Sequence, residues 1–391
     1  MKKIITISLG LSLCAFGMSY NAFKKYTIKN AKILKQQALS LERTQTENKI
    51  RLRSKNPTMG LEASQFSPTG VDNSFHYGAS VSQTVRTSSY FEGLEKKSDA
   101  LYLLQEAFVL DGKAGYLRNL EKLYTQYVYQ SKLLSLLQDE YKLSKKVTNI
   151  VDIRYKNGSE NKVAYLQAKT DTLALKTQMF STKQAMNRLY YQLLSVAGLK
   201  KKVTLEKQFI YEISAHINHN TALNSKQKIL SAKAKVLEGQ LSMDESVIEN
   251  YEVYGGIDDE PDQSVLRLGV SMALPIFNDK SEERMLIKLQ SQELALEKEQ
   301  LNINLYTQTQ MIHASIKELW EQHKALKILK NEQQQLTDLL QEGYKISQGS
   351  IFVLMNAKNK LIQTQKSLLQ TKKEINMQKT ELYFIKGVYN N

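Results

Sequence analysis

The stretch that decides the fold is Ser264–Asn278, which reads SVLRLGVSMALPIFN. From Leu266 to Leu274 every second residue is Leu, Val or Met, and Arg, Gly, Ser and Ala lie between them. Such alternation gives an extended strand one apolar face and one polar face. An earlier run, Phe75–Ser82, alternates in the same way. Both strands match the length of about 9 to 11 residues that a tilted β-strand needs to cross a bilayer.

Each of these strands has a candidate partner on its N-terminal side. The partners are Asn56–Phe66 and Val247–Gly255, with polar loops expected at Ser67–Ser74 and Gly256–Gln263. We therefore predict two β-hairpins, at 56–86 and 247–276. Four strands cannot close a barrel, and hydrocarbon tolerates no unpaired sheet edge. If the hairpins enter a membrane, several copies of the chain must share one barrel.

The remainder of the chain is predicted to be helical. Its four prolines lie in or beside the hairpins, and long proline-free stretches rich in Leu, Lys, Gln, Glu and Ala follow them. Apolar residues repeat there at the heptad spacing that is typical of coiled coils. Long helices are expected at 89–150 and 279–343, with return helices at 159–198 and 350–388. At about 1.5 Å per residue, each long helix would extend for about 90 to 100 Å.

The chain is interpreted as an internal duplication. Gly78 and Ser80 of the first hairpin recur as Gly269 and Ser271, about 190 residues later. The apolar seam recurs at a similar offset, from Met179, Met186 and Leu193 to Leu368, Ile375 and Leu382. We therefore expect a first repeat at 20–198, a connector at 199–221 and a second repeat at 222–391. Each repeat would contain a helix, a hairpin, a long helix and a return helix.

The first residues have the layout of an export signal. Two lysines precede an apolar run from Ile4 to Phe16, and small residues follow it. This layout predicts a secretory signal peptide at 1–19. An uncleaved anchor is one alternative. Lipidation at Cys14 is another, although Leu13 stands where a lipoprotein signal normally has a small residue.

Composition argues against an enzyme and against a metalloprotein. Among 391 residues there are one Cys and five His, which excludes a disulfide framework and a Cys-type zinc site. The sequence has no Gly-rich phosphate loop and no nucleophile elbow, so we predict no catalytic residue, no metal site and no cofactor. His216 and His219 lie in a polar stretch and are interpreted as solvated surface. The net charge of +15 is spread along the helices, which speaks against binding to nucleic acid.

The order of elements resembles the TolC-like outer-membrane efflux proteins over nearly the whole chain. The phrases that carry the resemblance are Asn56-Pro57, GASVSQ at 78–83, LGVSMALPIFN at 268–278, Tyr155-x-x-Gly158 and Tyr344-x-x-Ser347. The family implies a mainly α fold with a small membrane β part. A long coiled-coil α-helical barrel would continue into a 12-stranded β-barrel, to which each chain of a homotrimer contributes four strands.

The resemblance also implies a function and partners. The protein would be a channel in the outer membrane of a Gram-negative bacterium, with a long periplasmic extension. It would passively conduct substrate that an inner-membrane pump and a periplasmic adaptor protein deliver, and it would contact outer-membrane lipid. The alternative is a periplasmic structural or adaptor coiled coil, whose hairpins would pair within a soluble domain.

Site residues follow from the same resemblance. The residues expected to dock the adaptor lie at two tip turns: Tyr155, Asn157, Gly158, Tyr344, Ser347 and Gly349. One set of strand side chains is expected to face lipid: Tyr77, Ala79, Val81, Leu266, Leu268, Val270, Met272 and Leu274. The opposite set is expected to face the lumen: Gly78, Ser80, Gly269 and Ser271.

Three features depart from the family pattern. Ser347 stands where the family usually has Gly, although Gly349 follows two residues later. The stretch Lys345–Lys373 contains no acidic residue, so a cation-selecting acidic ring is not expected from that helix. Ser246 and Val247 stand where the third strand of the family begins with Pro.

Overall fold

The computed structural model of the chain describes residues 17–67, 69–70, 74–216, 222–260, 262–346 and 349–390. Most of the expected signal peptide, including Cys14, lies outside these residues, as do His219 and Ser347. The chain divides into two compact units. Unit one comprises Met1–Lys35, Lys113–Ala222 and Tyr306–Asn391, and unit two comprises Gln36–Gly112 and Leu223–Leu305.

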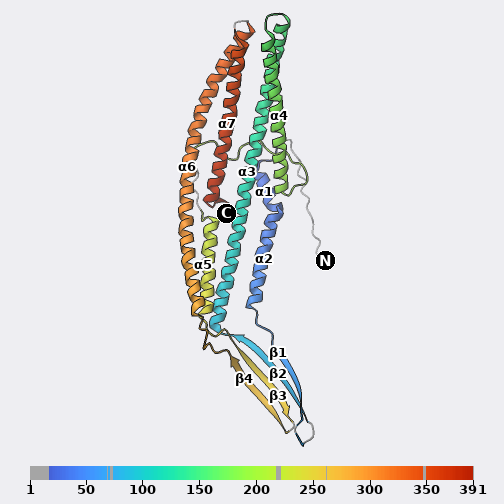
Figure 1. Ribbon diagram of the computed structural model, residues 1–391, viewed down its shortest axis with the longest axis vertical. Helices are drawn as coiled ribbons and strands as arrows, with labels where there is room; N and C mark the ends of the chain where they lie inside the picture. The colour runs from blue at the N-terminus through green and yellow to red at the C-terminus, as the bar shows by residue number, and fades with distance from the viewer. Residues whose placement is uncertain are drawn as a thin grey trace. The chain divides into compact units, whose positions relative to one another are not determined.

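Helices dominate both units, and four strands complete the described part of the chain (Figure 1). The helices are α1 (Tyr20–Asn30), α2 (Lys32–Leu52), α3 (Ser88–Lys156), α4 (Lys162–Val196), α5 (Ser225–Asp244), α6 (Ser281–Lys345), α7 (Ile351–Ile385) and the 3-10 helix η1 (Val388–Asn390). The strands are β1 (Thr58–Phe66), β2 (Ser74–Arg86), β3 (Asn250–Glu260) and β4 (Gln263–Met272). The predicted fold class, mainly α with a small β part, is confirmed.

The duplication is visible in the helix lengths. The long helices α3 and α6 have 69 and 65 residues, and each is followed by a helix of 35 residues, α4 and α7. Within unit one, Thr148 on α3 donates from its hydroxyl to the carbonyl of Ala168 on α4 at 3.0 Å. Lys366 on α7 donates to Gln178 on α4 at 2.8 Å. None of the described helices is long and apolar enough to cross a membrane.

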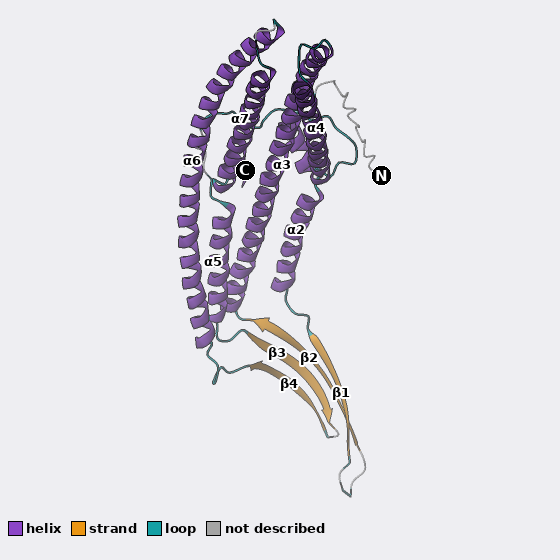
Figure 2. Cartoon of the chain, turned by 45° about the horizontal axis from the view of Figure 1, so that its top comes forward, coloured by secondary structure: helices purple, strands orange, loops and turns teal. Residues whose placement is uncertain are grey.

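The four strands form one antiparallel sheet in the order β1-β2-β3-β4 (Figure 2). Both expected hairpins are present, because β1 pairs with β2 and β3 pairs with β4. The two repeats meet in the middle of the sheet, where Ala79 of β2 lies opposite Ile257 of β3. Within the described residues, the outer edges of β1 and β4 have no partner strand.

The expected loop at Gly256–Gln263 is wrong for most of its length. Strand β3 continues to Glu260, and Asp258 and Asp259 pair with residues of both neighbouring strands. Gly and Asp have low strand propensity, so the local sequence alone predicts a loop here. Pairing with β2 on one side and β4 on the other satisfies their backbone groups and overrides that preference.

The helices of unit two follow the order of the strands that they adjoin. Asn48 on α2 donates to the carbonyl of Ser98 on α3 at 2.5 Å, so these two helices are neighbours. In the same unit Ser225 on α5 donates to Asp111 on α3 at 2.6 Å, and Gln227 on α5 donates to Asn302 on α6 at 2.7 Å. The order is thus α2-α3-α5-α6. Since α2 leads into β1 and β4 leads into α6, unit two is one strip of four helices and four strands.

A buried carboxylate connects several elements in the core of unit one. Glu121 on α3 is 2% exposed, and it accepts hydrogen bonds from the hydroxyl groups of Tyr20, Tyr211 and Tyr389. Lys24 lies 3.5 Å from the same carboxylate. Burial, and then the charge of Glu121, raise the pKa of all three tyrosines above the usual range. This cluster fixes α1, the connector and η1 to the middle of α3.

Candidate functional site

The sheet has one apolar face, to which all four strands contribute. Backbone register places Met59, Val81, Gly255 and Leu268 in one row across the sheet, and it places Leu61, Ala79, Ile257 and Leu266 in the next. These side chains share a face because alternate residues of a strand point the same way. The exposed large residues of this face are Met59, Leu61, Phe75, Tyr77, Val81, Val253, Ile257, Leu266, Leu268, Val270 and Met272. Seven of the eight expected lipid-facing residues therefore lie together on a face that nothing in the described chain covers, whereas Leu274 lies beyond the end of β4 at Met272.

The opposite face of the sheet is polar and carries charge. Asp258 lies 2.5 Å from Arg267 and 3.8 Å from His76, and Arg267 lies 3.6 Å from Glu260. A Cβ added at Gly78 would meet the Asp258 carboxylate at 2.7 Å, so the glycine leaves room for this group. The expected lumen-facing residues lie on this face, among groups that suit contact with water.

Tyr254 and Gly269 are paired across β3 and β4 on the polar face. A Cβ added at Gly269 would overlap the ring of Tyr254, so the ring lies directly over the glycine. Glycine is required here by the close approach of the ring and not by the backbone conformation. The sequence pattern identified Gly269, but it gave no sign of the aromatic partner.

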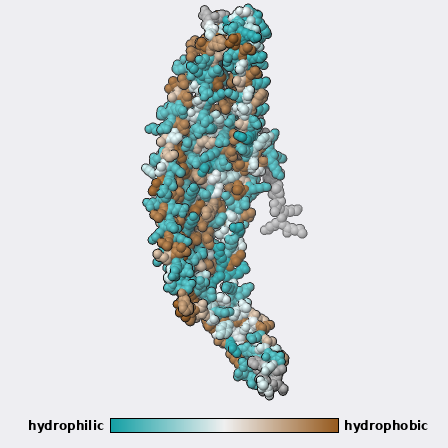
Figure 3. Space-filling view, viewed as in Figure 1, coloured by the Kyte–Doolittle hydropathy of each residue, from teal (hydrophilic) through white to brown (hydrophobic). Residues whose placement is uncertain are grey.

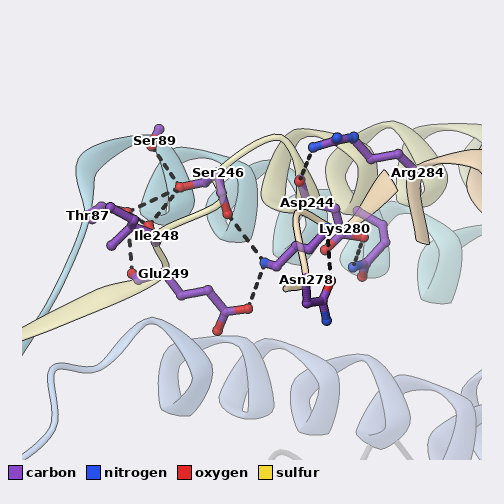
Figure 4. A network of polar contacts seen from close by, with 10 residues as sticks. Thr87, Ser89, Asp244, Ser246, Ile248, Glu249, Asn278, Lys280 and Arg284 are labelled. Carbon is purple, nitrogen blue, oxygen red and sulfur yellow. Dashed lines mark hydrogen bonds and ion pairs between the residues drawn. The ribbon is translucent and has the colours of Figure 1, made fainter. Parts of the chain in front are cut away.

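The strands join the helices of unit two through a network of polar contacts around Lys280 (Figure 4). Lys280 has a φ of 61°, a backbone conformation that residues other than glycine rarely adopt. Its ammonium group donates to Glu249 at 2.7 Å and to the carbonyl of Ser246 at 3.3 Å. Next to it, Thr87 donates to the carbonyl of Ile248 at 2.7 Å. These bonds fix the segment between β4 and α6 to the segment between α5 and β3.

The first tip turn, between α3 and α4, is closed by a glycine-dependent helix cap. Gly158 has a φ of 73°, its N–H donates to the carbonyl of Tyr155, and the N–H of Ser159 donates to the carbonyl of Arg154 at 2.8 Å. These bonds form a Schellman motif. Asn161 then begins α4 by accepting a hydrogen bond from the Ala164 N–H at 2.8 Å. A Cβ added at Gly158 would meet nothing within 4 Å, so the turn presents bare backbone to its surroundings.

The two tips are linked through Tyr344 within unit one. The Arg154 guanidinium donates to the Tyr344 carbonyl at 2.9 Å and lies 4.6 Å from the centre of its ring. The Tyr344 hydroxyl donates to Glu160 at 3.2 Å. Burial, and then the carboxylate of Glu160, raise the pKa of Tyr344, so its hydroxyl stays protonated and able to donate.

The structure places the expected docking residues in different environments. Asn157, Gly158 and Gly349 are exposed, and Tyr155 is half-buried against the ring of Tyr165 at a centroid distance of 5.5 Å. Tyr344 is only 2% exposed and packs in a core with Val151, Ala164 and Ile351. Gly349 does not adopt the left-handed conformation of Gly158. A Cβ added at Gly349 would lie 3.4 Å from the backbone nitrogen of Tyr344. The tip thus offers exposed turn residues supported by a buried tyrosine.

A buried lysine behind the tip was not recognised as a special site from the sequence. Lys358 on α7 is buried, and its ammonium group has no hydrogen-bond partner within the described chain. A cavity of about 20 Å³, lined by Glu140, Ser144 and Lys358 among others, has room for about one water molecule. Burial lowers the pKa of Lys358 and raises the pKa of Glu140. Because the side chain is buried, the Lys358 ammonium group does not lie on the surface of α7.

The described residues contain no group of three or more His, Cys, Asp or Glu side chains that could hold a metal ion. Of the two histidines weighed above, only His216 belongs to the described chain, where it is exposed. The candidate site is therefore built from surfaces and turns: a two-faced sheet with open edges in unit two, and a pair of linked helix tips in unit one.

This architecture is that of solved bacterial outer-membrane channels. No family model matches the chain, and no curated relative matches its sequence. The outer-membrane channel OprN has 12% sequence identity and a TM-score of 0.79, with 95% of this chain and 90% of OprN covered. The CmeC outer-membrane channel of Campylobacter jejuni has 14% identity and a TM-score of 0.77, with 94% and 85% covered.

A channel captured in its open state has the same fold. The MtrE outer-membrane channel of Neisseria gonorrhoeae has 14% identity and a TM-score of 0.73, with 93% of this chain and 88% of MtrE covered. At these identities the likeness establishes the fold. The resemblance to the TolC-like proteins that the sequence predicted is thus confirmed as a resemblance of fold.

Proposed function

We propose that the protein is the outer-membrane channel of a tripartite efflux or secretion system, and that it conducts substrate passively from a periplasmic adaptor and an inner-membrane pump to the exterior. The observation that carries the proposal is the strip of unit two. Its sheet has an apolar face and a polar face, and it ends in two strand edges, β1 and β4, that have no partner among the described residues.

Closure of the sheet follows from its open edges. An unpaired strand edge in hydrocarbon leaves backbone N–H and C=O groups without hydrogen bonds, at several kcal/mol each. The order of strands makes β1 and β4 antiparallel to each other, so β4 of one copy can pair with β1 of the next. We propose that three copies close a 12-stranded barrel in this way.

In the closed barrel, the two faces of the sheet would contact different surroundings. In a closed barrel the apolar face, with Leu266, Leu268 and Val270, would lie outward in lipid. The polar face, with Asp258 and Arg267, would lie inward around a water-filled lumen. No bond is made or broken in this function, so the proposed channel needs neither a catalytic residue nor a cofactor.

The tips of unit one are the proposed docking site for the periplasmic adaptor. Asn157, Gly158 and Gly349 are exposed at the two turns, and Tyr155 lies half-exposed beside them. The link from Arg154 and Glu160 to the buried Tyr344 would hold the two turns in a fixed relation. We propose that this link also keeps the inner end of the channel narrow until the adaptor binds.

The proposal is tested by locating and sizing the protein. We expect the mature chain to fractionate with outer membranes, to run as a trimer in native mass spectrometry from mild detergent, and to produce ion conductance in planar bilayers. Recovery of a soluble periplasmic monomer without conductance would instead support the alternative, a periplasmic structural or adaptor coiled coil.

A further inference from the structure

A fully exposed aromatic side chain marks the segment between β4 and α6. Phe277 is 100% exposed, and its neighbours Leu274 and Ile276 are 67% and 72% exposed. Apolar residues also gather where α6 begins in the space-filling view (Figure 3). Such a cluster on one edge of the strip is unfavourable in water and signals a binding surface.

Backbone geometry specifies what lies beside this segment in a closed barrel. Strands β1 and β4 run in opposite directions, so the end of β4 at Met272 would lie near the beginning of β1 at Thr58 in the next copy. The chain that follows β4, including Phe277, would then lie next to the chain that precedes β1. That chain is the linker Arg53–Pro57 of the next copy.

This linker, at the other edge of the strip, borders a cavity that extends inward to the beginning of β3. The cavity has a volume of about 470 Å³, and four segments line it: Ser54 and Lys55 of the linker, Gln83–Arg86 of β2, Tyr90 and Phe91 of α3, and Glu249 and Asn250 at the beginning of β3. A cavity of about 150 Å³ accommodates a benzene ring, so this one has ample room for the side chain of Phe277. Its aromatic rings and the Arg86 guanidinium are groups that pack well against a phenyl ring.

We propose that Phe277 of one copy inserts into the cavity behind Ser54 of the next copy and seals the junction where the sheet meets the helices. The proposal rests on the assembly put forward under the proposed function, and it assigns to that assembly a specific residue and a specific receiving site. It accounts for two features at the junction of sheet and helices: one edge of the strip carries an exposed ring, and the linker at the other edge borders a cavity without an occupant in the described chain.

The proposal is tested by cross-linking between copies in native membranes. Ser54→Cys and Phe277→Cys are combined in a Cys14→Ser background, which removes the chain's single natural cysteine. We expect oxidation to give covalent dimers and trimers on non-reducing gels, whereas neither single variant gives them. The matched control combines Ser54→Cys with Glu299→Cys, an exposed position further along α6, and we expect it to remain monomeric on the gel.

A second measurement asks whether Phe277 meets lipid instead. Trp320 is the only tryptophan, so Phe277→Trp in a Trp320→Phe background reports on this position alone. We expect brominated lipids to leave the fluorescence of this variant unchanged. Strong quenching, together with intact trimers that do not cross-link, would overturn the inserted ring and leave the proposed channel standing. Absence of trimers from the unaltered protein would overturn both.

Discussion

The ring of Tyr254 lies directly over Gly269, its cross-strand neighbour on the polar face of the sheet. We expect Gly269→Ala to impair trimer assembly, because the added methyl group would overlap the ring. Native mass spectrometry of detergent extracts measures the trimer fraction. Adding Tyr254→Ser should restore the trimers of Gly269→Ala by removing the obstacle. Failure of this rescue would show that the glycine is needed for a reason other than the ring.

The apolar face of the sheet should reject charge. We expect Leu268→Arg to reduce insertion into the outer membrane, because a cation facing lipid near the bilayer midplane costs about 2 to 4 kcal/mol. Ser271→Arg is the matched control, since Ser271 lies on the opposite face beside Glu252. Membrane fractionation with immunodetection compares the two. Equal insertion of both variants would contradict the assignment of the faces.

The first tip turn should tolerate only a small residue on its surface. Gly158→Trp should abolish co-purification of the adaptor while trimers persist, because the new side chain would project into open space at the turn. Gly158→Asn is the control, since Asn accepts a positive φ more readily than most residues. Pull-down from membranes measures adaptor binding. Normal adaptor recovery with the Trp variant would remove this turn from the docking site.

The link between the tips should restrain the inner end of the channel. Arg154→Ala removes a charged hydrogen bond to the Tyr344 carbonyl, an interaction worth about 1.5 to 3 kcal/mol. We expect higher mean conductance in planar bilayers, with Tyr344→Phe giving a smaller increase through loss of the bond to Glu160. Lys156→Ala, an exposed change on the same helix end, should leave the conductance unaltered. Conductance equal to that of the unaltered protein in all three variants would exclude a restraining role.

The buried carboxylate of unit one should make the fold sensitive to alkali. Tyr20, Tyr211 and Tyr389 have a raised pKa in the folded chain, whereas tyrosines in the unfolded chain ionise near pH 10. The unfolded state thus loses protons first. Stability should be complete below about pH 10 and decrease as the pH rises above it. Circular dichroism during alkaline titration measures this decrease.

Removing one of these tyrosines should weaken that dependence on pH. Tyr389→Phe eliminates one ionisable group, so we expect a shallower loss of stability above about pH 10 than in the unaltered chain. Tyr26→Phe, at an exposed position of α1, is the control and should retain the original slope. Identical slopes for Tyr389→Phe and the unaltered protein would show that another group governs alkaline unfolding.

The sequence revealed the features that depend on local periodicity. Leu266, Leu268 and Val270 share one face in the structure because alternation along a strand is a property of neighbouring residues. The family resemblance singled out Gly158, and the structure supplies the physical reason, since a helix that ends in a positive φ favours glycine. The duplication could also be recognised from the sequence, because similar short patterns recur in the same order in both halves.

Features that depend on distant partners were missed. Glu121 is joined to Tyr20 and Tyr389, about 100 and 270 residues away, and no local pattern signals such a contact. The continuation of β3 through Asp258 was overlooked because two neighbouring strands, rather than local propensity, hold it extended. The burial of Tyr344 likewise depends on α4 and α7 packing around it.

The pairing of Arg86 with Asn250 across β2 and β3 determines how late in synthesis the sheet can be completed. These residues are about 160 positions apart, so a chain that emerges N-terminus first exposes the inner edge of β2 long before its mate is synthesised. Throughout that interval the first hairpin has an unpaired strand edge, and it would aggregate unless another protein covers that edge. We therefore expect insertion of the proposed barrel to follow release of the complete polypeptide, and we expect a truncation before Asn250 to accumulate with periplasmic holdases or be degraded.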